Sequence, residues 1–148
     1  MAGEEKIPGG RVVAKGHHAE LTVDEIADLL PGGAALMDAL GRRYWVMYYA
    51  AKGGNWDLAR YEWRESLKVL RAMAKARPKY AEDLAAFEKE TFAPIGKALD
   101  AGDFPAFERA YRDGIEASDT YHRKYEKPYI RFRLPDRPPE WLDVSERE

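Results

Sequence analysis

Four segments with apolar residues at helical spacing, joined by very short connections, dominate this 148-residue sequence. They begin near Ala34, Asn55, Pro78 and Asp103. Each covers about 19 to 22 residues, which as a helix spans on the order of 30 Å. Connections of only about two to four residues require helices of equal length to fold back on one another. The sequence therefore predicts an all-α fold, an antiparallel up-down-up-down four-helix bundle.

The segment before the bundle, residues 1–33, is predicted to be an N-terminal arm with a short helix. Residues 1–21 are rich in glycine and show no periodicity. Thr22 and Glu25 have the spacing of a capping box, which indicates that a helix of about two turns starts at residue 23 and ends before Pro31.

The bundle itself is assigned to residues 34–127, and residues 128–148 form a Pro-rich C-terminal tail. At the start of this tail, apolar and basic residues alternate in the order Ile130, Arg131, Phe132, Arg133 and Leu134. The alternation is typical of a strand, but no second strand is predicted to pair with it. We expect an extended tail that packs in a groove of the bundle and is anchored by Trp141.

Composition excludes several classes of function. The net charge is −2, so no basic surplus favours nucleic acid or an anionic membrane as a partner. Arg42, Arg43 and Lys52 interrupt the most apolar stretch, which excludes a membrane span. The opening residues lack a secretory signal, so we expect a soluble cytoplasmic protein, or a periplasmic one if a leader was removed.

The second half of the first helix, with the sequence YWVMYYAA at residues 44–51, is apolar almost all the way round. Such a helix is either covered completely within its own domain or leaves one side for a partner. The second possibility predicts a homodimer.

One face of the fourth helix changes from apolar to polar along its length. At a period of 3.6 residues it carries Phe104, Phe107, Tyr111, Ile115, Ser118, His122 and Tyr125. In the predicted topology its polar end lies level with the start of the first helix, the end of the second and the start of the third. The neighbours expected there are Met37, Leu40, Gly41, Leu70, Met73, Leu84 and Phe87.

These residues predict a mostly apolar pocket with a few polar groups, as is usual for a small-ligand site. The candidate ligand-binding residues are Tyr44, Arg77, Tyr80, Ser118, Tyr121, His122 and Tyr125. In one interpretation they bind a small organic or anionic ligand without turnover. In the other, His122 is a core histidine bonded to a tyrosine or a backbone carbonyl. Hydroxyls buried without partners would cost about 1–3 kcal/mol each, so they require protein, water or a ligand.

Catalytic and metal patterns are sparse. A carboxylate-bridged two-metal centre needs Glu-x-x-His on two helices, whereas only Asp119 and His122 have that spacing. The chain contains no cysteine, which excludes disulfides, thiolate nucleophiles and covalent haem. It also lacks a Gly-rich phosphate loop and a serine elbow. A non-enzymatic role is expected, and His122 is the candidate ligand if any metal binds.

The sequence SDTYH at residues 118–122, near the end of the fourth helix, resembles the haem-attachment motif of the class II cytochromes c, the cytochrome c′ group. In that family a Cys-x-x-Cys-His motif attaches haem, and its histidine is the axial iron ligand. Ser118 and Tyr121 stand in place of the cysteines, whereas His122 matches the axial histidine. The resemblance implies the bundle over about residues 34–127.

Because the thiols are missing, the family's electron transfer and gas binding do not carry over. Three hypotheses follow. The chain is a haem-free bundle that binds another small molecule, a bundle that binds haem or iron non-covalently through His122, or an interaction module that acts as a homodimer through its surface.

Overall fold

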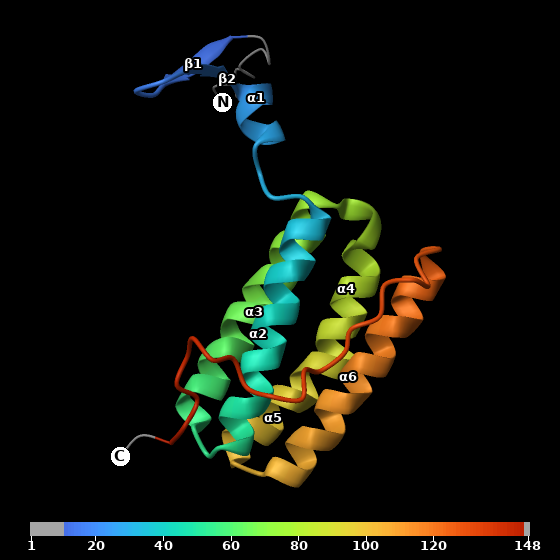
Figure 1. The fold of residues 1–148 in the computed structure, drawn as a ribbon. Coiled ribbons are helices and arrows are strands. Elements are labelled where there is room, and N and C mark those ends of the chain that lie inside the picture. The colour runs from blue at the N-terminus through green and yellow to red at the C-terminus, as the bar shows by residue number, and fades with distance from the viewer. Residues whose placement is uncertain (1–10, 147–148) are drawn as a thin grey trace, which may run out of the picture. The chain divides into compact units, whose positions relative to one another are not determined.

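The computed structural model describes residues 11–146. Within them the chain divides after Gly32 into two compact units, and helices make up most of the second (Figure 1). None of the described helices combines the length and the apolar character that crossing a bilayer requires.

The first unit is a small β-hairpin followed by a short helix. Strand β1 (Val12–Lys15) pairs antiparallel with β2 (Glu20–Thr22), and α1 (Val23–Asp28) follows directly. The capping box of α1 is confirmed, because the Thr22 hydroxyl accepts from the Glu25 amide and the Glu25 carboxylate accepts from the Thr22 amide. The sequence predicted an arm over residues 1–21 and no strands, whereas residues 12–22 form this hairpin. The first ten residues of the predicted arm lie outside the described part. Helix α1 also ends two residues earlier than predicted.

The second unit contains four helical stretches. The helices are α2 (Gly33–Lys52), α3 (Trp56–Ala76), the stretch of η1 (Pro78–Tyr80), α4 (Ala81–Phe87), η2 (Glu88–Phe92) and α5 (Ala93–Ala101), and finally α6 (Phe104–Lys124). Two of the helix starts expected from the sequence are capped by side chains: that of Asn55 accepts from the Leu58 amide, and that of Asp103 accepts from the Ala106 amide. Gly102, at φ 62°, ends α5 in the left-handed conformation that glycine favours.

The third stretch is interrupted just before Pro94. Proline cannot donate a backbone hydrogen bond, and the turn before it, η2, is a π-helix. The indole nitrogen of Trp63 donates to the Phe92 carbonyl over 3.0 Å, and the two rings stack with centroids 5.6 Å apart. The indole lies so close to Gly96 that an added Cβ would be 2.6 Å from it. The interruption of the third stretch therefore accommodates the large side chain of Trp63 from α3.

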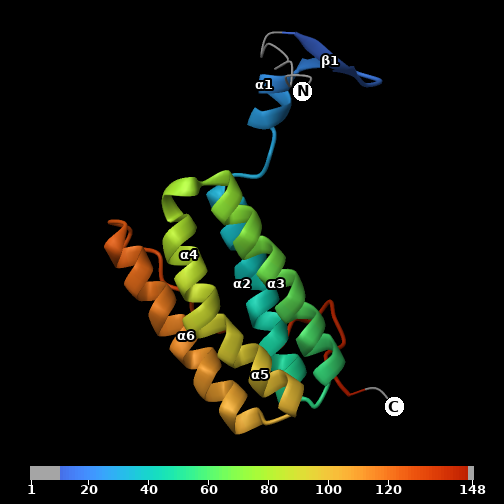
Figure 2. The same cartoon turned by 180° about the vertical axis from the view of Figure 1, so that it is seen from behind.

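Neighbouring helices pack in sequence order, with α2 against α3, α3 against α4 and α5, and α5 against α6, while α6 also touches α2 (Figures 1 and 2). The backbones of α4 and α6 do not approach as closely as those of α5 and α6. The largest completely buried side chains include Met47, Phe92, Ile95, Leu99, Phe107 and Tyr111. Most of them lie toward the α5 end, so the core is dense there and the helices diverge toward the other end.

Helix α6 ends at Lys124, before the expected break at Pro128. The Lys127 amide bonds the His122 carbonyl over 2.7 Å and the Glu126 amide bonds that of Arg123 over 3.1 Å, which is the Schellman pattern. Glu126 occupies the left-handed position of this motif at φ 60°, where glycine is usual. The motif turns the chain back toward α2.

Because a side chain in this conformation is strained by about 1–2 kcal/mol, Glu126→Gly is expected to raise the free energy of unfolding by about 0.5–1 kcal/mol. Denaturant unfolding of the full chain measures this change. The matched control is Glu116→Gly within α6, which is expected to lower stability by about 1 kcal/mol. A loss of stability in both variants would contradict the strained geometry.

After the turn, residues 127–146 contain no helix or strand; in Figure 1 they run back beside α6 and then cross in front of α2. The side chains of Tyr49 and Trp45 donate to the carbonyls of Pro135 and Arg137 over 2.6 and 2.8 Å. Phe132 packs edge-on against Tyr44 with centroids 5.6 Å apart. The tail therefore satisfies polar atoms on α2 and adds an apolar side chain to its surface.

Trp141 does not anchor the tail by burial, since it is 55% exposed. Its ring instead lies 4.1 Å from the Arg42 guanidinium carbon and edge-on to Trp45.

Much of the apolar second half of α2 is covered by the same chain. Its residues Val46, Met47, Ala50 and Ala51 are buried, and the flanking aromatics face the tail. The sequence argument for a homodimer was the apolar surface of this segment. The tail covers part of this apolar surface within one chain, so a second chain is not needed to cover that part. Dimerisation stays a prediction.

Candidate functional site

A cavity of about 430 Å³ opens at the end of the second unit where the helices diverge. Its lining comes from the start of α2, the end of α3, η1, α4, η2, the second half of α6 and the first part of the tail. The apolar lining includes Met37, Leu40, Leu70, Met73, Leu84, Phe87, Ile115, Ile130 and Phe132.

All the candidate ligand-binding residues border this cavity. They are Tyr44, Arg77, Tyr80, Ser118, Tyr121, His122 and Tyr125. The predicted neighbours on α2, α3 and α4 border it as well. Sequence reasoning missed Asp83, Lys127 and the tail residues 130–132. The signal for Asp83 was its position directly before Leu84 and one turn before Phe87 on the same helix, whereas the path of the tail has no local signal.

Tyr44, which borders the cavity, is paired with the completely buried Tyr111. The rings of Tyr44 and Tyr111 stack with centroids 3.9 Å apart and an interplanar angle of 8°. Each hydroxyl donates to the backbone carbonyl of the other residue, over 2.5 Å from Tyr44 and 2.9 Å from Tyr111. Burial raises the pKa of both hydroxyls far above the usual range. The Tyr44 hydroxyl is thus neutral and bonded within the protein, so it is not free to donate a hydrogen bond to a ligand.

Gly114 makes this arrangement possible. It lies on α6 facing the Tyr44 hydroxyl, and a Cβ at this position would come closer to that oxygen than any normal contact allows. The absence of a side chain here lets the tyrosine ring stand against the helix.

A polar cluster bridges α4 and α6 at the outer end of the cavity. Asp83 accepts from the Lys124 ammonium over 2.7 and 3.0 Å, and also from the Tyr125 hydroxyl. These bonds lower the pKa of Asp83 below its usual value, the Lys124 bond most, and the Asp83 carboxylate raises the pKa of Tyr125. The Tyr80 ring stands edge-on to that of Tyr125 at 4.6 Å. The Tyr125 hydroxyl is therefore committed to protein.

Several other polar groups on the second half of α6 are not committed in this way. Ser118 and Tyr121 make no side-chain hydrogen bond to the residues that the structure describes. The Nδ1 atom of His122 and the Oδ1 atom of Asp119 are buried and have no partner within residues 11–146. A buried polar atom left unsatisfied costs about 1–3 kcal/mol. This stretch of α6 thus presents unused hydrogen-bonding capacity at or beside the cavity.

The residues present do not fit a covalently held haem or a multinuclear metal centre. Ser118 and Tyr121 cannot form thioether bonds, and the described residues hold no group of three or more His, Asp and Glu suited to a metal ion. The Glu62 carboxylate is buried, and it accepts from the Arg43 guanidinium over 3.0 Å. Its burial raises its pKa, whereas the Arg43 bond opposes that shift.

No protein-family model, curated protein or solved structure matches this chain. The cavity and the charges around it are therefore the features that indicate a function.

Proposed function

We propose that the second unit is a non-enzymatic binding module, an up-down four-helix bundle that holds a small molecule in the cavity beside the end of α6. The observation that carries the proposal is the cavity itself. Its volume of about 430 Å³ and its mostly apolar lining with a few polar groups are typical of sites for small organic ligands. The resemblance to cytochrome c′ is consistent with a bundle that keeps such a pocket without attached haem.

The polar groups favour binding over turnover. Ser118 and His122 lie one turn apart on one helix, and no hydrogen bond joins them. Because no carboxylate or carbonyl of residues 11–146 orients the His122 Nδ1 atom, these residues do not assemble an activated nucleophile here. Ser118, Tyr121 and His122 instead supply donors and acceptors that orient a ligand, and Arg77 supplies positive charge at the edge.

The proposal is tested by filling the cavity. The neutral fluorophore N-phenylnaphthylamine is expected to bind the full chain with a rise in emission, since an apolar wall replaces water around it. Ser118→Phe places an aromatic ring where this hydroxyl borders the cavity. We expect it to weaken binding of the fluorophore at least about ten-fold, corresponding to about 1.4 kcal/mol, while stability is kept or raised.

The matched control is Thr120→Phe, two residues further along α6 at an exposed position outside the cavity. It adds the same ring but should leave fluorophore affinity unchanged. If both variants bind as the parent chain does, the fluorophore sits elsewhere and the cavity proposal fails.

Non-covalent haem or iron binding through His122 is the second candidate. The observation in its favour is that this imidazole borders the cavity and its Nδ1 atom is not used by another residue among those described. Against it, ligating histidines usually donate their second nitrogen to a carboxylate or carbonyl. Titration with hemin tests this candidate. A Soret shift that is lost in His122→Ala would support haem binding through His122, and the absence of a shift would exclude it.

A homodimer is the third hypothesis, and its remaining support is the aromatic surface of α2. Sedimentation equilibrium measures the mass of the full chain in solution. A value near the 16.9 kDa of one chain would remove this hypothesis.

A further inference from the structure

Positive charge gathers at one edge of the cavity. Arg77, at the end of α3, and Lys127, just after α6, both border it. The ring of Tyr80 lies between such groups, with the Lys79 ammonium 4.9 Å and the Arg77 guanidinium carbon 6.0 Å from its centre. A hydrogen bond from Lys79, and then the charges of Lys127 and Arg77, lower the pKa of the Tyr80 hydroxyl. Three cations thus act on one point of the edge.

The acidic residues nearby do not neutralise these cations. Asp83 is the acidic residue that borders the cavity among those described, and it is already paired with Lys124. Arg131, a third cation of the lining, has Asp119 as its partner at 3.9 Å.

By contrast, Arg77 and Lys127 have no ion pair within residues 11–146. They are therefore available for an external anion.

The apolar walls of the cavity favour hydrocarbon. Met37, Leu40, Leu70, Met73 and Leu84 come from three helices and contribute apolar surface. Methionine adapts to irregular apolar ligands, and each buried CH₂ group adds about four-fold in affinity. A small hydrophilic anion would gain nothing from these walls, and a neutral hydrocarbon would gain nothing from the charged edge.

We propose that the cavity takes amphipathic organic anions, with the apolar chain or ring system against the Met and Leu walls and a carboxylate, sulfate or phosphate group at Arg77 and Lys127. This inference rests on the proposed function, because it names the ligand class of the same cavity. Coulomb attraction at this partly exposed edge selects the sign of the head group, and apolar burial supplies most of the affinity.

The test displaces N-phenylnaphthylamine from the full chain with three ligands that share a twelve-carbon chain: dodecanoate, dodecanol and dodecylammonium. Dodecanoate is expected to bind at least about ten-fold more tightly than the other two. Its advantage over dodecanol should shrink as salt is added, because the edge is exposed to solvent. Acetate and inorganic phosphate, which carry a head group without a chain, should not displace the fluorophore.

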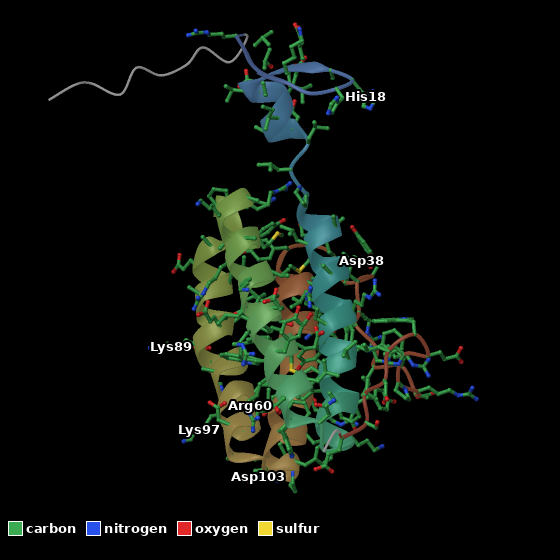
Figure 3. The ribbon with its side chains drawn as sticks, turned by 90° about the vertical axis from the view of Figure 1, so that its left-hand side faces the viewer. His18, Asp38, Arg60, Lys89, Lys97 and Asp103 are labelled. Atoms are coloured by element: carbon green, nitrogen blue, oxygen red, sulfur yellow. The ribbon has the colours of Figure 1, made fainter. Side chains whose placement is uncertain are left out.

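The double variant Arg77→Gln/Lys127→Gln should bring dodecanoate to the affinity of dodecanol and leave dodecanol unchanged. Lys89→Gln is the charge control, since Lys89 points outward from η2, away from the cavity (Figure 3), and should change neither affinity.

Equal binding of the three ligands, or tightest binding of dodecylammonium, would overturn this inference and leave the proposed function intact. Failure of the fluorophore and of all three ligands to bind would overturn both.

Discussion

Gly114→Ala is expected to lower the free energy of unfolding by about 2–3 kcal/mol, although alanine is the better helix former. The added methyl group would overlap the Tyr44 hydroxyl, while the ring carbon Cζ is 3.4 Å away. Tyr44 cannot turn aside easily, because its ring is stacked on Tyr111 and its hydroxyl is bonded to the Tyr111 carbonyl. Either the stack opens or α6 moves away from α2.

The double-mutant cycle with Tyr44→Phe isolates this overlap. Tyr44→Phe alone removes one hydrogen bond and should cost about 1 kcal/mol. In that background Gly114→Ala should cost close to nothing, because the oxygen is gone and the ring carbon is at an ordinary contact distance. Denaturant unfolding of the four proteins gives the coupling energy. Additive effects would show that the Tyr44 hydroxyl is not the reason why position 114 requires glycine.

The parts of the fold that sequence could predict are those fixed by local chemistry. Asn55 and Asp103 cap helices because their side-chain oxygens reach amides three residues on, and Gly102 ends a helix because it tolerates positive φ. The helical periodicity then placed four long helical stretches.

The hairpin at residues 12–22 was missed because its two strands are very short, and the glycine and histidines of its turn gave no clear hairpin signal. The early end of α6 was missed because Glu126 holds a conformation that its residue type does not favour.

The candidate site was predictable as far as it depends on helix faces. Ser118 and His122 follow Tyr111 on one stripe of α6, and connection lengths placed the start of α2 opposite them. What could not be predicted is how the polar groups pair. The commitment of the Tyr44 hydroxyl to a backbone carbonyl and of the Tyr125 hydroxyl to Asp83 are tertiary choices without a sequence signature.

These pairings change the chemistry of the site. They remove two of the expected hydroxyl donors from the cavity, and they use its one described acidic residue in a bond to Lys124. The groups left over are the cations Arg77 and Lys127 and the uncommitted side chains of α6. The selectivity of the cavity for anions thus follows from which polar groups the protein has already satisfied.

Phe132→Ala is expected to lower the free energy of unfolding by about 2–3 kcal/mol, somewhat less than for a completely buried phenylalanine. The ring is half-buried, packs edge-on against Tyr44 and lies 3.6 Å from where a side chain on Gly41 would begin. It also borders the cavity. Its loss should therefore weaken binding of N-phenylnaphthylamine as well as the fold, because one wall of the cavity comes from the tail.

Tyr129→Ala is the matched control, since it removes an aromatic side chain from the same tail at a position that is 77% exposed. We expect it to change stability by no more than about 0.5 kcal/mol and to leave binding unaltered. Denaturant unfolding and fluorophore titration of both variants measure the two effects. If Phe132→Ala changes stability and fluorophore affinity as little as Tyr129→Ala does, the tail does not pack on α2 in solution. That result would contradict both the cavity wall formed by the tail and the covered surface of α2.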